Sequence, residues 1–174
     1  MAVKVLKKLC VFFLLPVMML VGCEEVSEKT EIATDFSADF TAEYRGIEVR
    51  GSLSTNRQGV TNIRIDYPET ISGINFNYKN SELEMSRESL ICSADEAYLP
   101  QRSFPSLLRE LCKGIGNGRA EFVSQSEDKC TYNLKIDLGS CTISTDADGK
   151  ITDAEIKDAQ FSIKFSDTNI IGEQ

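Results

Sequence analysis

The fold is decided by the segment Phe36-Ser37-Ala38-Asp39-Phe40-Thr41-Ala42-Glu43-Tyr44. Apolar and polar residues alternate along it without a break. Because successive side chains of a strand point to opposite faces, this pattern predicts a strand with one buried face. Arg45-Gly46 predicts a turn, and the same alternation resumes from Ile47 to Ser54. The two segments therefore predict a β-hairpin at the start of the domain.

The same period of two, interrupted by short turns, recurs along most of the remaining chain. Further strands are expected over residues 63–67, 74–78, 83–85, 89–93, 121–126, 130–136, 141–143, 151–156 and 161–165. Pro68 ends the first of these, because proline cannot donate a ladder hydrogen bond. Many short strands that each have one apolar face indicate an antiparallel sheet.

One segment, from Ser103 to Gly114, predicts the single helix. Ser103 is a suitable N-cap, Pro105 fits an early helical position, and Gly114 or Gly116 would end the helix. Its apolar stripe consists of Leu107, Leu108, Leu111, Cys112 and Ile115. Because this stripe needs a partner surface, we expect a mainly β (α+β) fold. In it a strongly curved antiparallel sheet, or an incomplete β-barrel, covers one central helix.

The N-terminus has the pattern of an export signal. Lys4, Lys7 and Lys8 precede an apolar run from Leu9 to Val21, which is shorter than the roughly 20 residues of a spanning helix. The run ends in Leu20-Val21-Gly22-Cys23, which resembles the lipobox of exported bacterial lipoproteins, where the Cys thiol receives a diacylglycerol group. The alternative is an uncleaved membrane anchor with an incidental Cys.

The lipobox resemblance implies three parts of the chain: a lipoprotein signal peptide (1–22), the lipidated Cys23 with a flexible tether (23–34), and a single β-rich globular domain (35–174). It implies an exported protein, lipid-anchored to the outer face of the bacterial cell membrane. Two acyl chains anchor a protein stably without help from the folded domain. The function of the domain is therefore a separate question.

Composition and charge exclude several classes of function. Loss of the three signal-peptide lysines would leave 16 basic and 27 acidic residues, a net charge of −11. A nucleic-acid partner is not expected, because phosphate contacts need a basic patch. The chain contains no His, which excludes serine–histidine, cysteine–histidine and histidine–metal sites. No pair of carboxylates stands out, and we expect neither catalysis nor a cofactor.

A calcium loop is the one metal site to consider. Asp146, Asp148 and Glu155 occupy the third, fifth and twelfth places of an EF-hand pattern, with Gly149 at the sixth. Ser144 replaces the usual Asp at the first place, and strands rather than helices are expected on both sides. Because Asp-Ala-Asp-Gly also favours a hairpin turn, we expect a turn and no metal, with calcium ligation as the alternative.

Four cysteines follow Cys23 in the sequence: Cys92, Cys112, Cys130 and Cys141. Export permits disulfides, and four cysteines allow three full pairings. Their wide spacing does not match the close pairs of a structural zinc site. The pattern leaves disulfides and buried thiols both open.

The order of the elements resembles the lipoprotein-carrier (LolA-like) superfamily, whose exported members bind lipid or lipoprotein acyl chains. The resemblance rests on the lipobox, the opening hairpin, a second hairpin ending in Ile65-Asp66-Tyr67-Pro68, and the closing segment Phe161 to Asp167 after the helix. It implies an incomplete β-barrel with helical cover over an apolar cavity. No ligand-binding motif of the superfamily matches, so no ligand-binding residue is transferred.

We expect the domain to bind or carry a lipid or another apolar ligand between sheet and helix. The candidate cavity lining is Phe36, Phe40, Tyr44, Phe76, Leu107 and Leu111. The same residues would also fill a dry core, because a sequence does not distinguish a cavity from close packing. The alternative is a cell-envelope protein–protein interaction or assembly module without a small ligand, whose protein partner the sequence does not identify.

Overall fold

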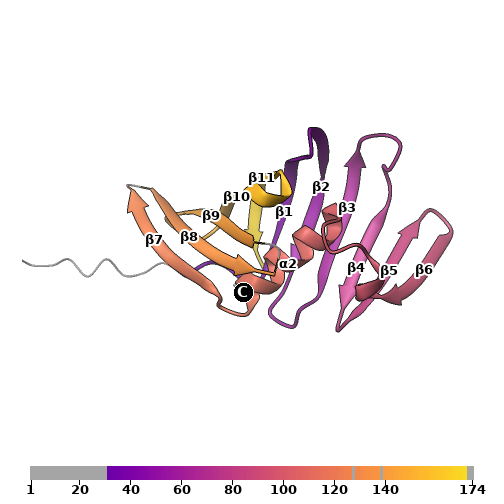
Figure 1. Cartoon of the computed structure of the whole chain (residues 1–174), viewed down its shortest axis with the longest axis horizontal. Helices are drawn as coiled ribbons and strands as arrows, with labels where there is room; N and C mark the ends of the chain where they lie inside the picture. The colour runs from indigo at the N-terminus through magenta and orange to yellow at the C-terminus, as the bar shows by residue number, and fades with distance from the viewer. Residues whose placement is uncertain (1–30, 127, 138, 172–174) are drawn as a thin grey trace, which may run out of the picture.

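A computed structural model describes residues 31–126, 128–137 and 139–171. They form one antiparallel sheet with a single α-helix against one face (Figure 1). The strands are β1 (Phe36–Tyr44), β2 (Ile47–Thr55), β3 (Thr61–Tyr67), β4 (Asn75–Lys79), β5 (Glu82–Arg87), β6 (Leu90–Asp95), β7 (Ala120–Ser126), β8 (Lys129–Ile136), β9 (Gly139–Asp146), β10 (Ile151–Ile156) and β11 (Phe161–Ile170). The helix is α2 (Phe104–Gly116), and two 3-10 helices are η2 (Glu96–Tyr98) and η3 (Lys157–Ala159).

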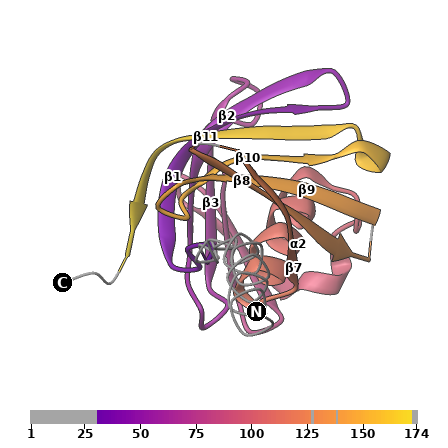
Figure 2. The same ribbon diagram turned by 90° about the vertical axis from the view of Figure 1, so that its left-hand side faces the viewer.

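The sheet consists of two meanders that meet at its centre. Its strand order is β6-β5-β4-β3-β2-β1-β11-β10-β9-β8-β7, so the first and last strands are neighbours. The segment from β6 to β7, which contains α2, returns across one face of the sheet, here called the inner face. The sheet curves around α2 (Figure 2) and stays open, because β6 and β7 do not pair with each other. The prediction of a mainly β fold with a curved antiparallel sheet around one helix is confirmed.

The core lies between α2 and the inner face. Four inward residues of β1 are buried: Phe36, Ala38, Phe40 and Ala42. The first residue of α2, Phe104, packs its ring against those of Phe40, Tyr44 and Phe161, with centroid separations of 5.8 to 6.0 Å. Aromatic pairs of this kind contribute about 0.5–1.5 kcal/mol beyond area burial, so this cluster attaches the start of α2 to the centre of the sheet.

The helix begins after Ser103 and ends at Gly116, as the sequence predicts, but its N-cap lacks a side-chain hydrogen bond. Ser103 occupies the N-cap position, but its side chain makes no capping hydrogen bond and pairs with the Ser106 hydroxyl at 2.8 Å. The helix continues to Gly116, two residues beyond Gly114. Gly114 is buried, and a Cβ there would lie 2.6 Å from Cδ2 of Leu134 on β8. Gly114 therefore permits the close approach of α2 to β8 and does not end the helix.

The last residues of the expected tether lie against the domain. Ile32 packs on the core, and the backbone N–H of Ala33 donates to the carbonyl of Gly149 at 2.9 Å. Cys23 and the signal-peptide residues lie outside the described part of the chain. Among the described residues, no helix is long and apolar enough to cross a membrane.

Candidate functional site

The predicted cavity-lining residues do not form one surface. Phe36, Phe40, Leu107 and Leu111 are buried within the core. Tyr44 and Phe76 are partly buried and pack against that core from different strands. Tyr44 also donates its hydroxyl hydrogen to the backbone carbonyl of Arg102, which ties β1 to the loop before α2. The prediction that these six residues contact a ligand remains a prediction.

An apolar surface lies instead where the sheet extends beyond the helix. Helix α2 packs on β8 and β3, and its Arg109 covers Tyr78 of β4, while the sheet extends past the helix towards β5 and β6 (Figure 1). Phe76 lies opposite Met85, and Met85 lies opposite Cys92, so these side chains share a face with each other and with Leu90. Phe76 and Met85 also contact the core, which identifies this face as the inner one. We call Phe76, Met85, Leu90 and Cys92 the apolar patch.

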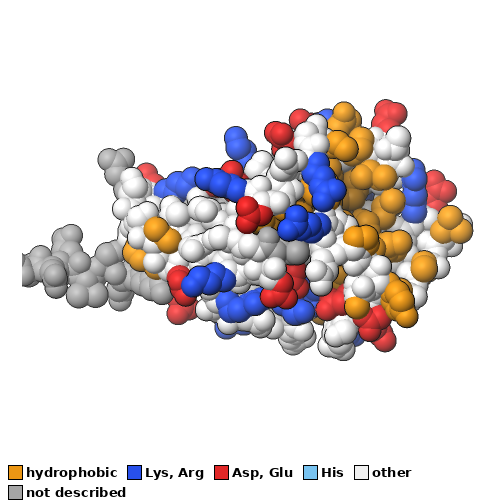
Figure 3. Space-filling view, in the orientation of Figure 1, with side chains coloured by type: hydrophobic (Ala, Val, Ile, Leu, Met, Phe, Trp, Pro, Cys, Tyr) orange, Lys and Arg blue, Asp and Glu red, His pale blue; other side chains and the backbone are white. Residues whose placement is uncertain are grey.

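The apolar patch becomes more exposed towards the end of the sheet. Phe76 and Met85 are partly buried, whereas Leu90 is 75% exposed. Tyr98 of η2, which follows β6 in the chain, is 83% exposed. Figure 3, which has the orientation of Figure 1, shows hydrophobic side chains gathered at the end of the molecule that contains β4, β5 and β6. Large contiguous apolar surfaces are typical of interaction sites, so the apolar patch is a candidate site.

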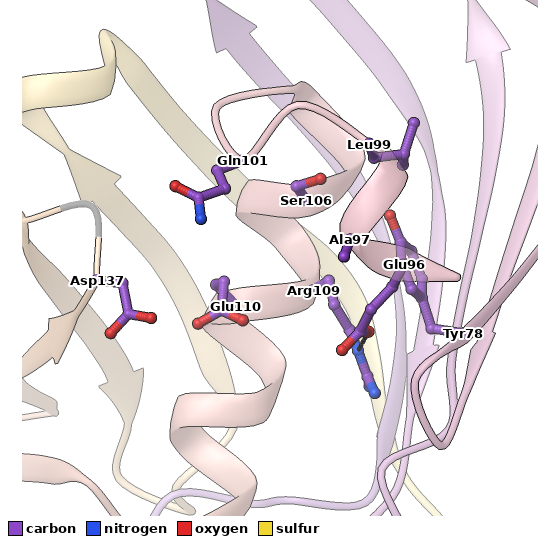
Figure 4. Close-up of a pocket in the computed structure, with 9 residues that line it drawn as sticks. All are labelled: Tyr78, Glu96, Ala97, Leu99, Gln101, Ser106, Arg109, Glu110 and Asp137. Carbon is purple, nitrogen blue, oxygen red and sulfur yellow. Dashed lines mark hydrogen bonds and ion pairs between the residues drawn. The ribbon is translucent and has the colours of Figure 1, made fainter. Parts of the chain in front are cut away.

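A separate cavity of about 220 Å³ lies beside α2 (Figure 4). Its lining residues are Tyr78 of β4; Glu96 and Ala97 of η2; Leu99 and Gln101 of the following loop; Ser106, Arg109 and Glu110 of α2; and Asp137, which follows β8. Ala97 and Leu99 make part of this lining apolar. The charged members are three acids and one base, so the cavity favours a cation over an anion.

The one base, Arg109, is buried and held by several contacts with the protein. Its Nη1 donates to the carbonyl of Gly59 at 2.7 Å and to Oγ1 of Thr61 at 2.9 Å. Its Nε lies 3.4 Å from Oε2 of Glu96, and its guanidinium carbon lies 5.4 Å from the centre of the Tyr78 ring. A buried charge must be paired, and these contacts join α2, η2 and the β2–β3 turn. Arg109 therefore has a structural role.

Tyr78 is the buried polar residue of the cavity. It is 1% exposed, and its hydroxyl oxygen has no hydrogen-bond partner among the described residues. Burial raises the pKa of Tyr78 to about 12, against the opposing effects of Ser106 and Arg109. Its hydroxyl group points towards the space beside Ala97 and Leu99 (Figure 4). Because Ser106 and Arg109 of α2 both act on this hydroxyl, Tyr78 belongs to the packing between β4 and α2.

The suspected calcium loop is a hairpin turn. Oδ1 of Asp146 accepts hydrogen bonds from the backbone N–H groups of Asp148 at 3.0 Å and Lys150 at 2.9 Å. Strands β9 and β10 flank the turn and pair antiparallel. Glu155 lies on β10, opposite Thr142. The predicted turn is confirmed, and calcium ligation by Asp146, Asp148 and Glu155 remains an untested alternative.

The four cysteines of the described residues are free thiols. Cys112, Cys130 and Cys141 are buried, and Cys92 is exposed on the apolar patch. Burial raises the pKa of Cys112 and of Cys141 to about 12, which keeps both thiols protonated and unreactive. The sequence left disulfides and free thiols both open, and the described structure has free thiols.

Sequence reasoning missed Arg109, Tyr78 and Glu96 as a group. Arg109 borders the apolar stripe of α2 beside Cys112, and helical spacing does not show on which side it falls. Tyr78 is predicted simply as an inward strand residue. Thr61 lies directly opposite it on β3, but no sequence signal joins these residues to Glu96, which lies in a 3-10 helix that sequence analysis treats as loop.

Comparisons with known proteins give similarity of fold alone. No protein-family model matches the chain, and no curated protein is found as a relative. An uncharacterized conserved protein from Thermus thermophilus is 10% identical, with a TM-score of 0.48 and 82% of each chain covered. A LolA superfamily protein from Nitrosomonas europaea is 9% identical, with a TM-score of 0.41, over 83% of this chain and 90% of that one.

A third similar structure is a putative outer membrane lipoprotein-sorting protein domain from Vibrio parahaemolyticus. It is 7% identical, with a TM-score of 0.37, over 80% of this chain and 86% of that one.

Proposed function

We propose that this protein is an exported lipoprotein, anchored through Cys23 to the outer face of a bacterial cell membrane, and that it binds the chain of a lipid or another apolar ligand. The observation that supports binding is the apolar patch, which continues the inner face beyond the cover of α2. The ligand would lie across β4, β5 and β6, with Phe76 and Met85 at the side of the core and Leu90 at the rim.

The position of the ligand differs from the sequence expectation. Phe40, Leu107 and Leu111, which were expected to line a cavity between sheet and helix, are buried in the core. A chain at the apolar patch needs no rearrangement of that core. Full burial of a Leu side chain contributes about 1.5–3 kcal/mol, so covering Leu90 alone would change affinity by about tenfold or more.

The test uses two neighbouring residues on opposite faces of one strand. Leu90 is on the inner face, whereas Ile91, 68% exposed and opposite Ser86, is on the outer face. The chain from residue 23, with Cys23→Ser to prevent lipidation, is titrated with the neutral fluorophore N-phenyl-1-naphthylamine. Leu90→Ser should weaken binding about tenfold, while Ile91→Ser should leave it unchanged. Equal effects of the two substitutions would contradict binding at the patch.

A second candidate function, protein–protein interaction, is favoured by the outer edge of β6. This edge has no neighbouring strand among the described residues, and β6 contains no Pro, Lys or Arg. Free edges without such residues accept an added strand. Ser93→Pro would block added-strand pairing, and an envelope partner that still co-purifies with this variant would not bind through β6.

A further inference from the structure

Strand β6 (Leu90–Asp95) is an edge of the sheet without the features that usually protect an edge. All six of its residues are exposed, and among the described residues only β5 pairs with it. Leu90 and Ile91 are largely exposed and point to opposite faces, so the edge is apolar on both. Protected edges carry Lys, Pro or a bulge, whereas β6 pairs with β5 without any shift of register. This edge is therefore open to an added strand.

The edge at the other end of the sheet, β7, differs in regularity. Its pairing with β8 shifts register between Phe122 and Ser124. A shift of this kind bends a strand and increases its twist, which disfavours pairing with a new strand. Glu121 adds a charge close to the shift. Within the described part of the chain, β6 is therefore the edge that is suited to strand addition.

The hairpin of β5 and β6 determines which backbone groups of β6 point outwards. A two-residue turn (88–89) joins Arg87 to Leu90, and these two residues lie opposite each other. Such a turn directs the N–H of Leu90 towards the carbonyl of Arg87, and the direction of the backbone groups then alternates along the strand. The residues whose N–H and C=O groups point towards the free edge are Ile91, Ser93 and Asp95.

A second copy of β6 matches this edge in an antiparallel pair. Residues directly opposite each other in such a pair share a face, so the inner faces of two copies lie on one side only when the strands are centred on a residue that faces itself. With Cys92 at the centre, Leu90 lies opposite Ala94 of the second copy on the inner face. Ile91 lies opposite Ser93 on the outer face, and both direct their backbone groups at the partner.

The other symmetric registers match less well. With Ser93 at the centre, the apolar side chain of Ile91 would lie opposite charged Asp95, and Leu90 would extend beyond the partner strand. With Ile91 at the centre, half of β6 would have no partner. The register centred on Cys92 places no acid opposite an apolar residue or another acid, because Asp95 lies beyond the paired residues. One β6 strand is therefore complementary to another.

We infer that β6 pairs with β6 of a second copy of this chain, in the antiparallel register centred on Cys92. The inference rests on the second candidate function, strand addition at β6, and names its partner. Residues 23–174 have a net charge of −11, so two copies repel each other, and a single added strand forms a small interface. We therefore expect a weak dimer, with a dissociation constant of about 100 µM.

Sedimentation velocity of the chain from residue 23 with Cys23→Ser, from about 10 µM to about 1 mM under reducing conditions, tests the dimer. Added salt should strengthen it, because salt screens the repulsion. Ser93→Pro removes an N–H directed at the partner and should weaken the dimer at least about tenfold, whereas Ser93→Ala keeps that N–H and should retain it. Circular dichroism checks that both variants are folded. A monomer at every concentration, or equal effects of the two substitutions, would overturn the inference.

Oxidation of Cys92 tests the register. Opposite residues of a pair without mutual hydrogen bonds have Cα atoms about 4.5 Å apart, which suits a disulfide. Diamide accepts two electrons and two protons from two thiols, so it should join two copies through Cys92 at high protein concentration. When Cys92→Ser is combined with Ala94→Cys, the thiol at position 94 would face Leu90 of the second copy, and joining should be at least about tenfold slower. Equal rates would overturn the register.

The outcomes separate this inference from the other proposals. A dimer that is lost in Ser93→Pro, without binding of N-phenyl-1-naphthylamine, would retain the inference and reject the lipid function. Fluorophore binding that is lost in Leu90→Ser, by a chain that stays monomeric, would retain the lipid function and overturn the dimer. A monomeric chain that co-purifies with an envelope protein through β6 would retain strand addition and overturn the second copy as its partner.

Discussion

Phe40 on β1 lies directly opposite Gly51 on β2, and the missing Cβ of Gly51 lets a third strand approach both. A Cβ at Gly51 would lie 1.9 Å from the backbone oxygen of Arg64 on β3 and 3.0 Å from Cζ of Phe40. Backbone atoms cannot move aside as a flexible side chain does. The pairing of β2 with β3 shifts register between Arg50 and Gly51, so this glycine marks an irregular point of the ladder.

We expect Gly51→Ala to lower the free energy of unfolding by about 2–4 kcal/mol, because β2 and β3 would have to separate locally. Urea denaturation followed by circular dichroism measures this loss. Gly116→Ala is the matched control: a Cβ there meets nothing within 4 Å, and alanine favours a helix. Equal destabilisation by both substitutions would contradict the role given to Gly51.

Asp146→Ala should destabilise the β9–β10 hairpin by about 1–2 kcal/mol, because two backbone N–H groups lose their acceptor. Asp146→Asn keeps an acceptor oxygen and should cost less. If the loop is only a turn, addition of calcium chloride should not change the melting temperature of the unsubstituted protein. A rise that depends on Asp148 would establish the calcium alternative.

The ion pair of Lys129 with Asp153, at 3.0 Å, makes stability depend on pH. Partial burial acts to raise the pKa of Asp153, but hydrogen bonds from Lys129 and two neighbouring hydroxyl groups outweigh it, so the pKa lies below its ordinary value. A depressed folded pKa stabilises the protein above the unfolded pKa of about 3.9, and this contribution is lost as pH falls through the folded value.

Lys129→Met should therefore lower stability at pH 7, by less than about 1 kcal/mol because the pair is partly exposed. The difference from the unsubstituted protein should shrink as the pH falls below about 4. Urea denaturation at pH 7 and pH 3 measures both values. A difference that grows in acid would show that Lys129 acts through another partner.

The thiols should react in two classes. Exposed Cys92 should react rapidly with Ellman's reagent at pH 8, whereas Cys112, Cys130 and Cys141 should react only after unfolding, because all three are buried. In the chain from residue 23 with Cys23→Ser, the native protein would thus release one equivalent of thionitrobenzoate, and Cys92→Ser would release none. Rapid reaction of a second thiol would show that the core opens readily.

The fold was largely predictable from local pattern. The alternation in Phe36–Tyr44 and its counterparts reflects burial of one face, which is a property of each strand alone. The pairing of β1 with β11 was not predictable, because Phe36 and Ile170 become neighbours only after the whole chain has folded. The sequence left open whether α2 ends at Gly114 or Gly116, because the close contact of Gly114 with Leu134 has no local signal.

The candidate site was less predictable than the fold. The sequence pattern identified the apolar residues of the strands. Whether Phe40 and Phe76 are packed or exposed depends on the position of α2. That position follows from the contacts of α2 with β3 and β8. Exposed Leu90 looked like any inward strand residue. The cavity beside α2 joins Tyr78, Glu96 and Arg109 from separate elements, and only the three-dimensional arrangement places them together.

Native mass spectrometry of the chain from residue 23 with Cys23→Ser, purified without detergent, measures whether the domain binds lipid. We expect added mass that matches a lipid, disappears on denaturation, and is reduced in Leu90→Ser but not in Ile91→Ser. A single ligand-free mass for the unsubstituted protein, which persists after incubation with lipid vesicles, would contradict lipid binding. The free edge of β6 would then be the first surface to examine for a protein partner.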